Sequence, residues 1–254
     1  MEHFDLKGRV AIVTGGNGGI GLGMARGLAK AGAAIVVAGR NAKKSADAVR
    51  GLESLGARAL AIEADVTQEA SCRQLIEESV RRLERLDILI NNAGIALRKP
   101  PQDYTLVDWH KVVDANLTSA FTCAHAAYPH FKRAGGGKII NIGSILSIFG
   151  APFAVAYAAS KGGLVQMTKA LATAWAKDNI QVNAILPGWI DTDLTVSARE
   201  QVPGLNENVL KRTPAGRWGR PEDFEAVAVF LAGPGSAFVN GTAIPVDGGY
   251  SVQV

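Results

Sequence analysis

Short apolar runs rich in β-branched residues alternate with amphipathic stretches of helical length, and this alternation restricts the possible folds most. Stretches such as 68–83 and 164–177 repeat their apolar residues every three or four positions, as a helix with one buried face does. The apolar runs lie at 10–13, 34–37, 59–62, 88–90, 138–142, 181–185 and 242–246. Strands that alternate with helices pair in parallel and need helices on both faces of the sheet. We therefore predict the α/β class, with a Rossmann-like, doubly wound, parallel sheet of seven strands.

The composition indicates one globular domain. The chain has 254 residues, of which 48% are hydrophobic and 20% charged, as in ordinary globular proteins with a substantial core. No linker interrupts it, so we assign 1–254 to a single domain. The sequence does not start with a basic stretch followed by an apolar one, and no apolar run reaches membrane-spanning length, which favours a cytoplasmic protein without membrane contact. The long segment without clear periodicity, about 188–214, is expected to be a functional loop.

Charge and ligand patterns argue against several classes of function. The formal net charge is +4, but lysine and arginine are scattered rather than clustered, so we expect no nucleic-acid partner. Cys72 and Cys123 are far apart in helical patterns, which suggests neither a disulfide framework nor a thiolate metal site. The histidines show no metal-ligand spacing, so we expect no metal.

A glycine-rich turn follows the first apolar run and leads into a predicted helix. It reads Thr14-Gly15-Gly16-Asn17-Gly18-Gly19-Ile20-Gly21. In this context backbone N–H groups and the positive end of a helix meet the diphosphate of a dinucleotide. The turn therefore predicts a dinucleotide cofactor, with Gly15, Asn17, Gly19, Ile20 and Gly21 as binding residues.

The end of the second apolar run indicates which nicotinamide cofactor the chain uses. Enzymes that prefer NAD often have an acidic residue here for the ribose, whereas a nearby arginine suits the 2′-phosphate of NADP. This chain has Arg40 in Ala38-Gly39-Arg40-Asn41 and no carboxylate there. Because a guanidinium can bind phosphate through two hydrogen bonds, we predict that NADP(H) is favoured over NAD(H). The alternative is that Arg40 only occupies a surface turn.

A tyrosine and a lysine form a candidate acid–base pair. Tyr157 and Lys161 are four positions apart, which places both side chains on one face of a helix. An ammonium close to a phenol, together with an oxidised nicotinamide, lowers the pKa of the tyrosine. Ser144 follows the run 138–142, at the edge where open α/β sheets bind ligands, and lacks the Gly-x-Ser-x-Gly elbow of serine hydrolases. Taken alone, the tyrosine and lysine would also fit an ordinary helix face.

These motifs, taken in order, resemble the short-chain dehydrogenase/reductase family over essentially the whole chain. The motifs are the glycine turn, Asn91-Asn92-Ala93-Gly94, Asn116, Ser144, Tyr157 and Lys161. The resemblance implies that Tyr157 is the general acid–base, and that Lys161 lowers its pKa and binds the nicotinamide ribose. It also implies that Ser144 hydrogen-bonds the substrate carbonyl, and that Asn116 holds a water for proton relay.

The same resemblance implies further cofactor contacts and an assembly. The contacts map onto Asp65, Val66, Asn92, Ala93, Gly94, Tyr157 and Lys161, and the turn after the sixth apolar run adds Pro187, Gly188, Ile190 and Thr192. Members of the family are commonly homotetramers, built through the helical stretches 106–133 and 155–177. We therefore expect a homotetramer.

The implied reaction is hydride transfer between NADP(H) and a carbonyl or secondary alcohol. Residues 214–223 and the loop after Ser144 resemble the family's sugar-acid dehydrogenases for gluconate and 2-deoxy-D-gluconate. We therefore expect a small-molecule substrate, namely a sugar acid, sugar or polyol. A 3-oxoacyl-acyl-carrier-protein reductase or a general ketone reductase is the alternative. A non-catalytic dinucleotide sensor would be a different class of protein, and it would not need all four catalytic residues.

Overall fold

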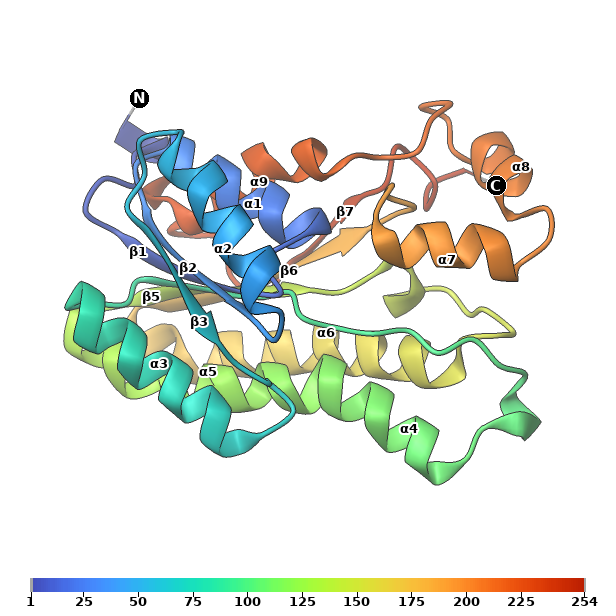
Figure 1. The fold of residues 1–254 in the computed structure, drawn as a ribbon, viewed down its shortest axis with the longest axis horizontal. Coiled ribbons are helices and arrows are strands. Elements are labelled where there is room, and N and C mark those ends of the chain that lie inside the picture. The colour runs from blue at the N-terminus through green and yellow to red at the C-terminus, as the bar shows by residue number, and fades with distance from the viewer. Residues whose placement is uncertain (1, 254) are drawn as a thin grey trace.

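Seven parallel strands form one sheet, as the sequence predicted, and their order is β3-β2-β1-β4-β5-β6-β7 (Figure 1). The computed structural model describes residues 2–253. The strands are β1 (Val10–Thr14), β2 (Ala34–Gly39), β3 (Ala59–Glu63), β4 (Ile88–Asn91), β5 (Gly137–Ile142), β6 (Ile180–Pro187) and β7 (Ala243–Val246). Each predicted apolar run therefore lies in a strand.

Helices cover both faces of this sheet (Figure 1). One layer contains α1 (Gly19–Lys30), α2 (Ala42–Glu53) and α9 (Glu225–Ala232). The other contains α3 (Glu69–Leu83), α4 (Leu106–Val113), α5 (Ser119–Ala134) and α6 (Val155–Trp175), with α3 against α5 and α4 against α6. Within residues 2–253, no helix is both long and apolar enough to traverse a bilayer.

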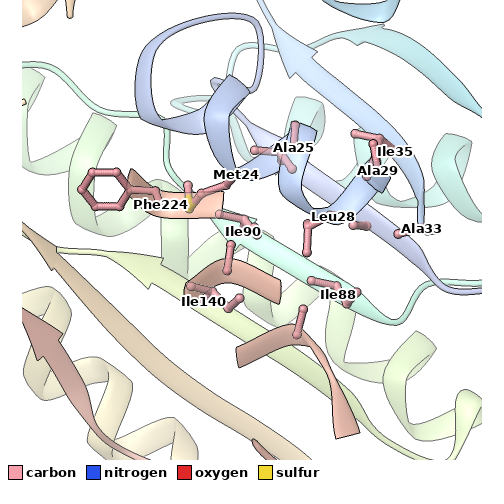
Figure 2. Packing of buried hydrophobic residues seen from close by; sticks show 14 of the residues in the cluster. Met24, Ala25, Leu28, Ala29, Ala33, Ile35, Ile88, Ile90, Ile140 and Phe224 are labelled. Carbon is pink, nitrogen blue, oxygen red and sulfur yellow. The ribbon is translucent and has the colours of Figure 1, made fainter. Parts of the chain in front are cut away.

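Alternate residues of the central strands are buried in two separate cores. In β4, Ile88 and Ile90 pack with Met24 and Leu28 of α1 (Figure 2). Leu89, between them, belongs to the core on the opposite face. Because a shift by one residue would exchange these two faces, burial on both sides fixes the strand register. It thereby fixes which residues lie at the carboxyl ends of the strands.

The carboxyl ends of β1 and β4 meet at the point where the strand order reverses. β1 pairs with β2 on one side and β4 on the other. Thr14, the last residue of β1, accepts hydrogen bonds at its Oγ1 from the backbone N–H groups of Asn92 (3.0 Å) and Ala93 (3.1 Å). The same hydroxyl donates to Ile90 O at 3.3 Å. Ligands of open α/β sheets bind in the crevice at such a reversal.

The segment 188–214, expected to be an irregular loop, contains two helices, α7 (Asp193–Gln201) and α8 (Leu205–Arg212). The expectation of irregular structure was wrong because both helices are too short to show clear periodicity. Their apolar residues, Ala198, Leu205 and Val209, form a small separate core against Trp189 and Trp218. This core includes Trp218, which lies outside the segment, and a local sequence pattern does not report that contact.

Candidate active site

A cavity of about 320 Å³ opens at the carboxyl ends of the strands. Its walls come from the glycine-rich turn, the ends of β4 and β5, the start of α6, and the β6–α7 connection with the start of α7. Most residues expected from the sequence line it: Gly15, Asn17, Gly19, Ile20, Asn92, Gly94, Ser144, Tyr157, Lys161, Pro187, Gly188, Ile190 and Thr192. Six expected residues do not: Gly21, Arg40, Asp65, Val66, Ala93 and Asn116.

The glycine-rich turn approaches its neighbours too closely for side chains. Gly15 and Gly19 have φ of +63° and +50°, which favour glycine. A Cβ at Gly21 would lie 2.5 Å from Gly15 O and would also collide with the amide of Asn92. That amide donates to Thr14 O at 2.9 Å and Gly15 O at 3.1 Å, and so holds the turn against β4. Gly21 therefore lies behind the cavity wall and shapes it.

The start of α1 fits a diphosphate. Its first residues line the cavity, and no side chain caps its N-terminus at Gly18. The amide groups of the first turn are thus available to an anion, and the helix dipole favours negative charge there. A Cβ at Gly18 would meet nothing within 4 Å, so the entrance beside the turn is open.

Arg40 and Asp65 lie beyond one end of the cavity, after β2 and β3. The Arg40 side chain is exposed, and among residues 2–253 it has no ion pair or side-chain hydrogen bond. Two hydrogen bonds from Thr67 and the charge of Arg40 hold the pKa of Asp65 below its usual value. A cation without a fixed partner fits a phosphate group, whereas an occupied carboxylate is a poorer acceptor for ribose hydroxyls.

Ser144 and Tyr157 face each other across the chemical end of the cavity. The Ser144 Oγ accepts the Leu146 N–H at 3.1 Å, and its hydroxyl lies close enough to the Tyr157 phenol to affect the pKa of that phenol. Burial raises the pKa of Tyr157, while the Ser144 hydrogen bond and the charge of Arg98 act in the opposite direction. The net shift is therefore upward in the protein alone, where the sequence had led us to expect a lower pKa caused by Lys161.

Lys161 is buried one helical turn after Tyr157. Its Nζ lies 5.7 Å from the centre of the Tyr157 ring and donates a hydrogen bond to Ile142 O at 2.6 Å. Burial lowers the pKa of Lys161 to about 8. A buried ammonium with one backbone acceptor retains two donors, which can bind hydroxyl groups of a ribose.

Asn116 lies behind the cavity wall, in a π-helical turn (Asp114–Thr118) between α4 and α5. Its Oδ1 accepts the Ile95 N–H at 2.8 Å, and its Nδ2 donates to Ile95 O at 3.0 Å and Ser160 Oγ at 3.0 Å. The Ser160 hydroxyl in turn donates to Tyr157 O at 2.8 Å. Asn116 is thus linked through Ser160 to the backbone of the turn that carries Tyr157.

Arg98 is a cavity residue that the sequence did not reveal. Its guanidinium lines the cavity, donates to Leu194 O (3.3 Å) and Gln201 Oε1 (3.4 Å), and its charge acts on Tyr157. Burial lowers the pKa of Arg98. Its segment has neither a glycine motif nor helical spacing. In the sequence, only its position as a cation soon after Asn92-Ala93-Gly94 could have pointed to Arg98.

Known proteins share this arrangement over the whole chain. A family model described as enoyl-(acyl carrier protein) reductase matches residues 15–251. The 2-dehydro-3-deoxy-D-gluconate 5-dehydrogenase of Escherichia coli (strain K12) is 42% identical over 251 residues, covering 98% of both chains. The gluconate 5-dehydrogenase of Gluconobacter oxydans (strain 621H) is 39% identical over 259 residues, covering 100% of both.

A solved structure agrees with these relatives. The gluconate 5-dehydrogenase from Burkholderia cenocepacia J2315, in complex with NADP and tartrate, has a TM-score of 0.94 and 42% identity, covering 100% of this chain and 99% of its own. The fold thus agrees with the sequence matches. The chain belongs to the short-chain dehydrogenase/reductase family and is an oxidoreductase.

Proposed function

We propose that this enzyme transfers a hydride between NADP(H) and a hydroxyl or keto group of a sugar acid. The observation that carries the substrate class is Arg98, a cation that lines the same cavity as Ser144, Tyr157 and Lys161. A guanidinium binds a carboxylate more strongly than it binds a neutral hydroxyl. The relatives named for gluconate and 2-dehydro-3-deoxy-D-gluconate, and the tartrate in a similar structure, support the same class.

Ser144 and Tyr157 act together on the substrate oxygen. Because the Leu146 N–H is donated to Ser144 Oγ, the proton of the serine hydroxyl is directed away from it, towards Tyr157 or a carbonyl oxygen. During reduction Tyr157 donates its phenolic proton to the developing alkoxide, and during oxidation it accepts the proton of the alcohol. The bound nicotinamide would supply or accept the hydride.

Lys161 and Asn116 support this proton transfer. The Lys161 ammonium, fixed by Ile142 O, places positive charge near the Tyr157 ring and retains donors for the nicotinamide ribose. Asn116 holds the backbone of the Tyr157 turn through Ser160. The relay water expected at Asn116 remains a prediction. Exchange of solvent protons with the phenol in an Asn116→Ala variant would test it.

For the cofactor, we propose that Arg40 binds the 2′-phosphate of NADP(H). Its exposed guanidinium has no ion pair within residues 2–253, and similar structures contain NADP. An Arg40→Gln variant should weaken NADPH binding by about tenfold and leave NADH binding unchanged, because only NADPH has the extra phosphate. Fluorescence titration with both cofactors measures this. Equal losses for the two cofactors would contradict the proposal, and Arg50→Gln, on α2, is a control for general charge effects.

The substrate proposal is tested by a spectrophotometric panel. NADPH and NADH are each combined with keto sugar acids, ketoses, acetoacetyl thioesters and simple ketones, and the reverse reactions are measured alongside. We expect the highest kcat/KM for a keto sugar acid with NADPH. A preference for the thioester would favour a 3-oxoacyl-acyl-carrier-protein reductase, which the apolar residues Ile145, Leu146 and Phe153 of the cavity would suit. No turnover with any compound would favour a dinucleotide sensor.

We further infer a cytoplasmic homotetramer. The exposed face of α5 carries Phe121, 49% exposed and stacked on His125, and the start of α4 carries the exposed Leu106 and Val107. Contact with other subunits would remove these apolar side chains from water. Sedimentation of wild type and Phe121→Lys tests the assembly, because a charge in a buried interface should dissociate it. A monomeric wild-type protein would contradict the inference.

A further inference from the structure

Ser147 lies outside the cavity, yet its hydroxyl connects two of the proposed catalytic residues. Its Oγ donates to the backbone carbonyl of Lys161 at 2.8 Å and accepts the backbone N–H of Ser144 at 3.2 Å. A serine hydroxyl has one proton to donate, so the first bond determines where that proton points and the second uses a lone pair. Ser147 thus joins the loop of Ser144 to the helix of Lys161.

A third hydrogen bond closes a ring. The Lys161 ammonium donates to Ile142 O at 2.6 Å, and the chain runs from Ile142 through Gly143 to Ser144. Lys161 is therefore held at both ends, by its carbonyl through Ser147 and by its ammonium through Ile142. One anchor is the carbonyl of Ile142 and the other reaches the N–H of Ser144, so together they enclose Gly143. Without Ser147, only the Ile142 bond would remain in this ring.

The surroundings of Ser147 leave room for its hydroxyl. A Cβ at Gly143 would lie 3.0 Å from Ser147 Oγ and 2.5 Å from a methyl group of Leu186. A Cβ at Gly162, the residue after Lys161, would lie 3.8 Å from Ser147 O. Glycine at 143 thus lets the serine hydroxyl approach the strand end.

We propose that Ser147 is a positioning residue, which sets the separation between the Ser144 hydroxyl and the Tyr157 phenol. Tyr157 lies on the helical turn directly before Lys161, so a bond to the Lys161 carbonyl restrains that turn of α6. The bond to the Ser144 N–H restrains the partner hydroxyl. The inference rests on the proposed function only in that both groups must act on one substrate oxygen.

Removing the hydroxyl tests the proposal. In Ser147→Ala we expect kcat to fall about 10- to 100-fold, with the Kd for NADPH within twofold of wild type, because small misplacements of reacting groups are costly. Alcohol oxidation requires the phenolate. Since the Ser144 hydrogen bond lowers the pKa of Tyr157, the rise of kcat with pH should shift to higher pH in this variant. A general loss of stability would not shift the pH profile.

Two variants serve as controls. Ser147→Thr keeps the hydroxyl and should recover most of the activity. Ser79→Ala removes a buried serine that also donates to a helix carbonyl, that of Leu75, but lies on α3, and it should leave kcat and the pH profile unchanged. If Ser147→Ala does not fold, Ser147→Cys has nearly the same size and donates only weakly, and it should show the same pH shift with a smaller loss.

The outcomes separate this inference from the proposed function. Wild-type activity on a thioester instead of a sugar acid would contradict the substrate proposal alone, and Ser147 would then be measured with that thioester. A folded Ser147→Ala or Ser147→Cys enzyme with wild-type kcat and an unshifted pH profile would overturn the inference. So would a loss of kcat that Ser79→Ala reproduces.

Discussion

The floor and the lid of the cavity are held in different ways. The floor, which comprises the glycine-rich turn 14–21 with Asn92 and Ala93, is fixed by backbone groups. Thr14 Oγ1 and the Asn92 amide together make five hydrogen bonds there, all of them to backbone atoms of β4, of the residues that follow it or of the turn. A side chain at Gly21 would collide with this network. The floor therefore tolerates little change.

The lid, which comprises α7 and α8, has its own small apolar core and is further held by exposed cationic side chains. The Arg212 guanidinium lies 4.4 Å from the ring centre of Tyr250 and 5.2 Å from that of Phe149. Lys44 Nζ pairs with Asp193 Oδ2 at 3.0 Å, with both side chains mostly exposed. Such contacts contribute about 0–1 kcal/mol each. A turn fixed by close backbone contacts is thus combined with a cover that can change at little cost to the fold.

Tyr157 lies between floor and lid, and its replacement should have the largest effect. In Tyr157→Phe the ring remains and the proton donor is lost, so we expect kcat to fall by about 10²- to 10⁴-fold. The Kd for NADPH should remain within a few-fold, because the floor is untouched. Steady-state kinetics and fluorescence titration measure the two quantities. A wild-type rate would exclude Tyr157 as the acid–base.

Gly21→Ala tests whether the floor is as intolerant as its contacts indicate. The new methyl group would lie 2.5 Å from Gly15 O, and moving that backbone should cost about 1–3 kcal/mol. We expect NADPH affinity to fall about 10- to 100-fold, with a lower Tm. Gly51→Ala is the matched control, since a Cβ there meets nothing within 4 Å and should stabilise α2 slightly. Unchanged NADPH binding in Gly21→Ala would refute a rigid floor.

The floor was predictable from the sequence because both of its parts are recognisable motifs, although the hydrogen bonds that join them span 76 to 79 residues. The turn needs glycine at 15 and 19, where φ is positive, and it follows a strand. Both features can be recognised in a single sequence. The strands were predictable for the same reason, since burial on both faces makes them continuous apolar runs. Tyr157 and Lys161 were found because one helix carries both.

The lid was not predictable because its contacts join distant residues that belong to no recognisable motif. Arg98 reaches Leu194 and Gln201 across about a hundred residues, and Arg212 meets Phe149 and Tyr250. The net rise in the pKa of Tyr157 has a similar origin, because burial by the assembled cavity determines it. The spacing of residues along the sequence does not predict these contacts or the burial of Tyr157.

Arg98→Gln probes the proposed contact between Arg98, which is hydrogen-bonded to the lid, and the substrate. If Arg98 binds the carboxylate, KM for a sugar acid should rise about tenfold or more, as expected for loss of a charge-assisted hydrogen bond. KM for a neutral ketose should change little. Lys99→Gln is the matched control, because its ammonium pairs with Asp108 at 2.7 Å and does not line the cavity. Equal rises in KM for acid and neutral substrates would assign Arg98 to the lid alone.

Arg212→Gln should have the smallest effect and sharpens the contrast most. The change removes both stacking contacts of α8 while keeping a long polar side chain. Because each contact is partly exposed, we expect stability to fall by no more than about 1 kcal/mol and NADPH affinity to stay at the wild-type value. KM for the substrate should rise about two- to fivefold as α8 loosens, because α8 packs against α7 and the start of α7 lines the cavity. Thermal unfolding and steady-state kinetics test this together. A loss of NADPH affinity comparable to that of Gly21→Ala would show that the floor and the lid do not act independently in binding.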